Sequence, residues 1–235
     1  MRRCAAVPRD STSTRGTAAQ RRAAARELIE AAAGPIGDGT RAILYAPTWR
    51  DGAADPAVPT TDEWRALIEV LTRQDAVLLV RSHPLGAGEY VPPTPTERVR
   101  SLGSDLVADV TPLLPGLDAL VTDYSSLAFD ASLVPLPVLF LAPDVAPYAH
   151  RRGFYGTYAE VAGGDWSTGW RQCTDQLDAL LGDEAVREAL LDRSRQLDAR
   201  VHAFRDGGNT RRVYRAILAG LGDPTASDDP LGRHR

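Results

Sequence analysis

The chain has 235 residues, of which 43% are hydrophobic and 25% charged, proportions that are typical of a globular protein and argue against global disorder. At about 150 residues per domain, this length allows one α/β domain with tails or two small domains. The 27 basic and 31 acidic residues give a net charge of −4, which offers no general attraction for nucleic acid. No apolar run approaches the ~20 residues that a membrane-spanning helix needs.

All basic residues are arginine, because the sequence contains no lysine. Phosphate contacts must therefore come from planar guanidinium groups, and Walker-type phosphate loops are excluded. The two cysteines, Cys4 and Cys173, lie far apart and fit a reducing compartment. With no Asp-x-Asp pair and no metal-spaced His or Cys set, the sequence predicts neither a metal site nor another cofactor.

Short apolar runs alternate with stretches of helical spacing along the chain. Residues 1–16 are polar and irregular, and residues 17–33 predict a helix that ends at a Gly-Pro stop signal. The apolar runs predict strands at 41–47, 76–81, 119–122 and 138–141, and a further short strand is expected near 99–102. The other predicted helices are 61–74, capped by Thr61 or Asp62, and 109–115, 125–132, 174–182, 184–204 and 209–221. Residues 85–97 and 148–154 predict loops.

This alternation predicts an α/β fold, a Rossmann-like parallel sheet with helices on both faces. The expected organisation is an irregular segment and connector helix over 1–40, one ligand-binding α/β domain over 41–222, and a flexible tail over 223–235. The glycine fingerprint of dinucleotide-binding proteins is absent after every predicted strand.

Polar clusters follow three of the predicted strands, where a parallel sheet binds its ligands. Thr48 and Arg50 follow the first strand, and His83 follows the second. Arg81 precedes His83 by two residues and shares its strand face, so the two side chains can brace a diphosphate. A salt-bridged strand edge would leave the same pattern.

The segment Thr122-Asp123-Tyr124-Ser125-Ser126 joins a strand to a helix. Its side chains can cap the free N–H groups of the helix, or the N–H groups and hydroxyls together can bind a phosphate. Further along, Arg151 and Arg152 either reach a phosphate or belong to a solvated loop.

Four segments in this order resemble a known family. They are ILYAPTWRD at 43–51, VRSHP at 80–84, VTDYSSLAFDASL at 121–133 and PYAHRRGFY at 147–155, with VPRD at 7–10 as a weaker fifth. Together they resemble the CDP-glycerol glycerophosphotransferase family, the polymerases and primases of wall teichoic acid and similar polyol-phosphate polymers. The resemblance covers roughly residues 7–220.

The resemblance implies the C-terminal, donor-binding half of a GT-B transferase. It places Arg81 and His83 at the donor phosphates, with His83 also the candidate catalytic group. The other implied donor-site residues are Thr48, Arg50, Thr122, Asp123, Ser125, Ser126 and Arg152. The N-terminal half, with its tryptophan-histidine-glycine segment and its base, has no counterpart in the sequence, so independent catalysis is not expected.

The implied reaction transfers glycerol phosphate from CDP-glycerol, or a similar CDP-alcohol, to a polyol-phosphate or lipid-linked acceptor, without a bound metal. The implied location is cytoplasmic, or peripheral at the inner face of the cell membrane. Two alternatives remain: a GT-B glycosyltransferase that uses a nucleotide sugar, and a non-catalytic nucleotide-binding remnant. If a partner half is missing, the helices at 17–33 and 209–221 should expose apolar surface, with Val213, Ile217 and Leu218 on one face of the latter.

Overall fold

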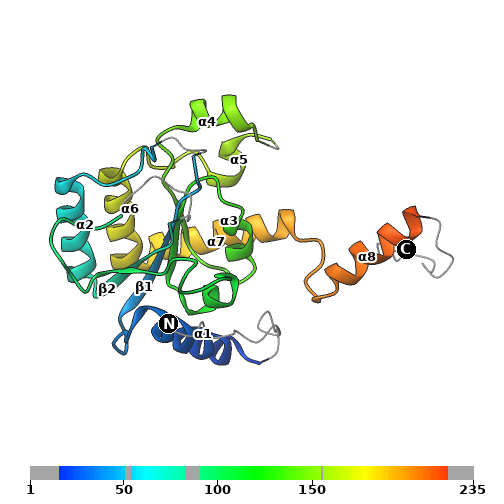
Figure 1. The fold of residues 1–235 in the computed structure, drawn as a ribbon, viewed down its shortest axis with the longest axis horizontal. Coiled ribbons are helices and arrows are strands. Elements are labelled where there is room, and N and C mark those ends of the chain that lie inside the picture. Colours follow the sequence, from blue (N-terminus) through cyan, green and yellow to red (C-terminus); the bar gives the residue numbers. More distant parts are fainter. Residues whose placement is uncertain (1–15, 51–53, 83–89, 155, 222–235) are drawn as a thin grey trace.

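The computed structural model describes residues 16–50, 54–82, 90–154 and 156–221, which form a parallel sheet with helices on both faces (Figure 1). The five strands are β1 (Arg41–Ala46), β2 (Ala76–Val80), β3 (Val99–Ser101), β4 (Ala119–Thr122) and β5 (Val138–Phe140). All of them pair in parallel, in the order β3-β2-β1-β4-β5. The predicted fold class and the predicted strands are confirmed.

The strand order reverses at β1, which is flanked by β2 on one side and β4 on the other. The chain leads from β1 to β2 on one side of β1, and later from β3 to β4 on its other side. A crevice therefore opens between these connections, beyond the carboxyl ends of the strands. Ligands of open parallel sheets bind at such a reversal.

Alternate residues of each strand pack on opposite faces of the sheet, and this builds two apolar cores. In β1, Leu44 points into one core together with Leu79 and Leu120, whereas Ile43 and Tyr45 point into the other. Every residue of β2 and β4 is buried, which explains why these strands read as continuous apolar runs in the sequence.

Helices from separate parts of the chain cover the two faces. The first core is covered by α1 (Ala18–Ala33), the 3-10 helix η1 (Thr111–Gly116), α3 (Leu127–Ser132) and α5 (Tyr158–Ala162). The second is covered by α2 (Thr61–Arg73) and α6 (Trp170–Gly182), with α7 (Glu184–Val201) packed against α6 and α3. The remaining helices are α4 (Val145–Arg152), beyond β5, and α8 (Asn209–Gly220), which projects from the body (Figure 1).

Helix α1 is tied to the sheet by packing and by ion pairs. Ile29 is fully buried in the first core. Arg22 and Arg26 pair with the carboxylate of Asp118 at N–O distances of 2.6 and 2.7 Å, and the same carboxylate accepts the backbone N–H of Ala42 at 2.8 Å. The domain boundary expected at residue 41 stays a prediction. Helix α1, which precedes this boundary, contributes Ile29 to the core of the α/β domain.

Two local predictions are wrong. The N-cap of α2 is Thr60 rather than Thr61 or Asp62, because Thr60 and Glu63 form a reciprocal capping box, which requires Glu or Gln three positions after the cap. The predicted loop around Arg151 is the helix α4. Pro147 lies in its first turn, where a missing N–H costs nothing, and Gly153 ends it with a φ of 72°.

The apolar-surface prediction holds for α8 and fails for α1. In α8, the predicted Val213 and Ile217 are 59% and 55% exposed, as is Tyr214 at 61%, whereas the predicted Leu218 is half-buried. In α1, by contrast, none of the large apolar side chains is exposed, so its packing on the sheet is complete. Across the described ranges, no helix combines the length and the apolar character that crossing a bilayer demands.

Candidate functional site

A pocket of about 470 Å³ lies at the reversal of strand order, beyond the carboxyl ends of β1, β2 and β4. The loops after these strands form its walls. It is lined by Ala46, Pro47, Arg81, Ser82, Ser104, Val110, Ser125, Ser126, Leu127 and Asp130. The structure thus brings together three of the predicted site residues: Arg81, Ser125 and Ser126.

Arg81 provides the positive charge of this pocket. Its guanidinium donates to the backbone carbonyls of Leu102, Val107 and Ala108 at 3.2, 2.7 and 3.2 Å, which fixes its orientation without neutralising it. Burial lowers the pKa of Arg81 and nearby Asp109 raises it, but an arginine stays protonated at neutral pH. Within the described ranges it forms no ion pair with a carboxylate, so its charge is available to an anionic ligand.

The two serines contribute differently. Ser125 Oγ accepts the backbone N–H of Leu127 at 3.2 Å and so caps the start of α3. Ser126 is exposed, and its hydroxyl forms no capping bond. The Ser125 hydroxyl therefore stabilises the helix, and the Ser126 hydroxyl faces the pocket. Helix capping and ligand binding, the two interpretations of this segment, are thus compatible.

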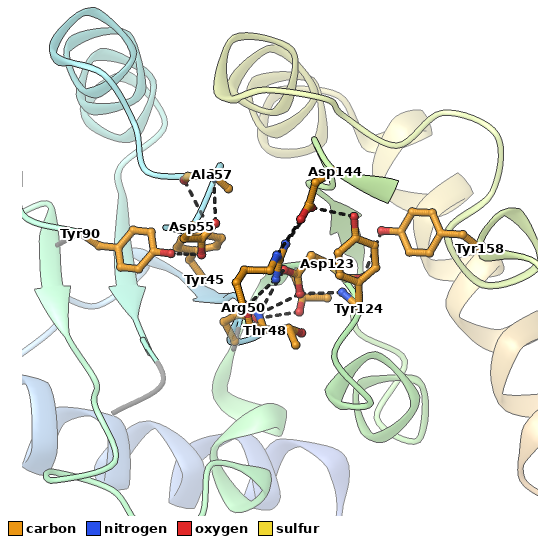
Figure 2. A network of polar contacts seen from close by, with 12 residues as sticks. Tyr45, Thr48, Arg50, Asp55, Ala57, Tyr90, Asp123, Tyr124, Asp144 and Tyr158 are labelled. Atoms are coloured by element: carbon orange, nitrogen blue, oxygen red, sulfur yellow. Dashed lines mark hydrogen bonds and ion pairs between the residues drawn. The ribbon is translucent and has the colours of Figure 1, made fainter. Parts of the chain in front are cut away.

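Four other predicted residues do not line this pocket and instead make polar contacts between β1, β4 and the segments that follow them: Thr48, Arg50, Thr122 and Asp123. Figure 2 shows Thr48, Arg50 and Asp123. Thr122 is fully buried and donates to the carbonyl of Ala46 at 2.7 Å. Asp123, 3% exposed, accepts the backbone N–H groups of Thr48 and Tyr124 at 2.9 and 2.6 Å. Among the described residues, the buried Thr48 hydroxyl has no hydrogen-bond partner. Direct contacts of these four residues with the donor stay a prediction.

Arg50 is the centre of this network (Figure 2). Its guanidinium binds both oxygens of Asp144 at 2.9 and 3.0 Å and one oxygen of Asp123 at 2.8 Å, with a side chain only 5% exposed. Burial opposes its charge, but the hydrogen bonds of Asp144 and Asp123 prevail and raise the pKa of Arg50. It also lies over the ring of Tyr124, 4.9 Å from the centroid. Arg50 therefore positions the loops after β1, β4 and β5.

An aromatic cluster anchors α4 beside this network. Tyr124 stacks on Tyr148 with ring centroids 3.8 Å apart, and both contact Phe154. Arg152, the last residue of α4, lines a separate small hollow of about 30 Å³ with Trp49 and Tyr148. The structure does not bring Arg152 into the larger pocket.

His83, the candidate catalytic group, lies outside the described residues. The sequence interpretation missed Asp144 and Asp130. Asp144 follows the fifth strand and holds Arg50 from 94 positions away, a pairing that no local pattern indicates. Asp130 was detectable, because it lies four positions after Ser126 and hence on the same side of the predicted helix.

The sheet topology and the pocket define a class, the open parallel α/β domains that bind ligands at a strand-order reversal. Residues 11–219 match the family described as CDP-Glycerol:Poly(glycerophosphate) glycerophosphotransferase. Since this match spans most of the sequence, the chain belongs to that family.

Named relatives agree with this assignment. The chain is 30% identical over 184 residues to the teichoic acid glycerol-phosphate transferase of Staphylococcus aureus (strain NCTC 8325 / PS 47), covering 76% of this chain and 45% of the relative. It is 32% identical over 123 residues to the teichoic acid glycerol-phosphate primase of Bacillus subtilis (strain 168), covering 52% and 31%. The chain thus spans less than half the length of these relatives.

Solved structures confirm the fold. The wall teichoic acid polymerase TagF superimposes with a TM-score of 0.65 at 23% identity, covering 91% of this chain and 51% of that one. A putative UDP-N-acetylglucosamine 2-epimerase from Listeria monocytogenes superimposes with a TM-score of 0.52 at 18% identity, covering 83% and 48%. At these identities the likeness concerns the fold alone.

Proposed function

We propose that this chain is the donor-binding part of a transferase that moves glycerol phosphate from CDP-glycerol, or a similar CDP-alcohol, to a polyol-phosphate acceptor. The observation that carries the proposal is the single pocket that combines Arg81, Ser125 and Ser126 in a member of the glycerophosphotransferase family. The relatives are named glycerol-phosphate transferase and primase, and a TagF variant was studied after soaking with CDPG.

In the proposed reaction, an acceptor hydroxyl attacks the phosphorus of the glycerol phosphate group. A new P–O bond forms, the bond from that phosphorus to the bridging oxygen breaks, and CMP leaves with the electron pair. A base takes the hydroxyl proton. Arg81 stabilises negative charge on the transferred group and on CMP, and the Ser126 hydroxyl donates to a phosphate oxygen.

The proposal requires a second half for acceptor binding. Two observations support it: the chain covers 45% or less of the named relatives, and α8 presents exposed apolar side chains. We assign the base to that half, with His83 as the alternative within this chain. A nucleotide donor and a lipid-linked acceptor would place the enzyme at the inner face of the cell membrane.

Calorimetric titration tests the donor assignment. We expect CDP-glycerol and CDP to bind, more weakly as salt rises because the contacts are ionic, and UDP-N-acetylglucosamine to bind at least tenfold more weakly. Ser126→Asp places a carboxylate in the pocket and should weaken CDP-glycerol binding about tenfold or more. Thr210→Asp, at the exposed start of α8, is the matched control and should bind like the unmodified chain.

Two outcomes would contradict the assignment. Equal or tighter binding of the UDP sugar would favour the nucleotide-sugar alternative. Unchanged CDP-glycerol affinity in Ser126→Asp would show that the donor lies elsewhere.

A further inference from the structure

The small hollow beside α4 lies at the same edge of the sheet as the donor pocket. Trp49 and Arg50, in the segment after β1, line the hollow, whereas Pro47, earlier in the same segment, lines the donor pocket. The other lining residues of the hollow are Asp144, Pro147, Tyr148, Arg151 and Arg152. Its volume of about 30 Å³ admits a group of the size of a phosphate oxygen and not a nucleotide.

Positive charge prevails around this hollow, although the whole chain has a net charge of −4. Among the described residues, three arginines and one aspartate line it. The aspartate, Asp144, is bound at both oxygens by Arg50, and Asp123 also pairs with Arg50. Even with Asp123 counted, arginines outnumber carboxylates by three to two. Arg151 and Arg152, both exposed in the last turn of α4, give the hollow a positive rim.

The structure fixes both the floor and the wall of the hollow (Figure 2). Arg50, whose side chain is only 5% exposed, is oriented by Asp123 and Asp144. Asp144 directly precedes α4 and accepts the hydroxyl of Tyr124 at 2.9 Å. Within α4, Tyr148 stacks on Tyr124 with ring centroids 3.8 Å apart. A buried guanidinium and an anchored helix make this a preorganised site, which distinguishes it from two arginines on an unsupported surface.

The proposed reaction needs an acceptor next to the donor pocket, because the attacking hydroxyl must reach the donor phosphorus. A polyol-phosphate chain carries a negative charge on each phosphodiester, so the repeats behind the attacking hydroxyl need positive groups outside the donor pocket. Planar guanidinium groups bind phosphate oxygens through paired hydrogen bonds. The hollow offers these groups, shares the segment after β1 with the donor pocket, and is too small for the nucleotide of the donor.

We propose that Arg151 and Arg152 bind a phosphodiester of the acceptor polymer, with one phosphate oxygen in the hollow beside Arg50. This inference rests on the proposed function and deepens it, because it assigns part of the acceptor contact to this chain. It also separates Arg152 from the donor, with which the sequence resemblance grouped it. The remaining acceptor contacts belong to the second half.

Titration calorimetry of the full chain with a glycerol-phosphate oligomer of defined length tests the inference. Arg151→Glu and Arg152→Glu should each weaken oligomer binding about tenfold or more, because a contact to a charged phosphate is replaced by repulsion. The affinity for CDP-glycerol should not change. Arg171→Glu, which reverses an exposed arginine in α6, is the matched control and should leave both affinities unchanged.

Several results would overturn the inference. Loss of CDP-glycerol affinity, alone or together with oligomer affinity, would place the arginines at the donor. An equal loss of oligomer affinity in Arg171→Glu would mean that the oligomer is held by nonspecific charge. A lowered melting temperature with unchanged affinities would mean that the arginines only stabilise the last turn of α4.

A lipid headgroup is the other source of a phosphodiester. Sedimentation with phosphatidylglycerol vesicles distinguishes it, since vesicle binding that Arg151→Glu abolishes, with oligomer affinity unchanged, would assign the arginines to the membrane and overturn the inference. Absence of oligomer binding to the unmodified chain would also overturn it, and retained CDP-glycerol binding would then leave the proposed function intact. Failure of CDP-glycerol to bind, with oligomer binding retained, would contradict the proposed donor and not the acceptor contact.

Discussion

Arg50 and Arg81, the two arginines near the candidate site, have different roles although their side chains are chemically identical. Arg50 forms ion pairs with two carboxylates and stabilises the fold. Arg81 donates only to backbone carbonyls, so its positive charge is not neutralised and can attract an anionic ligand. A carbonyl accepts a hydrogen bond without cancelling the charge, so the kind of partner decides the role. Sequence position does not reveal this, because both arginines follow strands of the same sheet.

Asp130 gives a pH-dependent prediction at the residue scale. Its pKa is raised in the folded state, chiefly by burial, so the folded protein binds more protons than the unfolded one between the ordinary aspartate pKa and the raised value. Stability is therefore lost as pH rises through that window, and the ionised group is destabilising at neutral pH.

Asp130→Asn should consequently match or exceed the stability of the unmodified chain at pH 7, and its advantage should vanish as the pH approaches 4. Urea unfolding at a series of pH values measures this difference. A variant that is less stable at pH 7 would show that the Asp130 carboxylate has a stabilising partner in the folded state.

At the scale of elements, the sequence predicted the buried strands and most helices because apolar runs and helical spacing are local signals. The short strand predicted near 99–102 is also present as β3, although Val-Arg-Ser is not an apolar run. Helix α4 lies where the sequence predicts a loop, because Pro147 is tolerated in a first helical turn and Gly153 ends the helix. The network around Arg50 could not be predicted, since it joins residues up to 94 positions apart.

The attachment of α1 gives a prediction at this scale. Asp118→Ala removes the partner of Arg22 and Arg26 and leaves the N–H of Ala42 without its acceptor. We expect a loss of about 2 kcal/mol in the free energy of unfolding. Asp62→Ala, which breaks an exposed ion pair with Arg65, should cost less than about 1 kcal/mol.

Urea unfolding compares the two variants. Equal small losses would mean that α1 is held by Ile29 and its apolar neighbours alone.

At the scale of the whole molecule, α8 is the feature that the isolated fold leaves unexplained. The helix projects from the body (Figure 1), and its apolar side chains Val213, Tyr214 and Ile217 are exposed. An exposed apolar stripe of this kind indicates an interaction surface. The proposed second half supplies the partner of that surface, and the donor pocket lies on other elements.

Val213→Ser together with Ile217→Ser should therefore leave CDP-glycerol affinity unchanged and weaken association with a separately expressed N-terminal half about tenfold or more. That half should also restore turnover with CDP-glycerol and a glycerol-phosphate primer, which we do not expect from the chain alone. CMP release by the chain alone would contradict this division of labour, and absence of turnover with the added half would favour the non-catalytic alternative.

The central claim is that the donor occupies the pocket at the strand-order reversal. Nuclear magnetic resonance of the isotope-labelled chain, titrated with CDP-glycerol, tests this most directly by mapping the backbone amides whose shifts change. We predict that the largest changes fall on Arg81, Ser104, Ser125 and Ser126. Changes gathered instead around Trp166, Gln176 and Arg193, which line a different hollow of about 200 Å³, would contradict the claim.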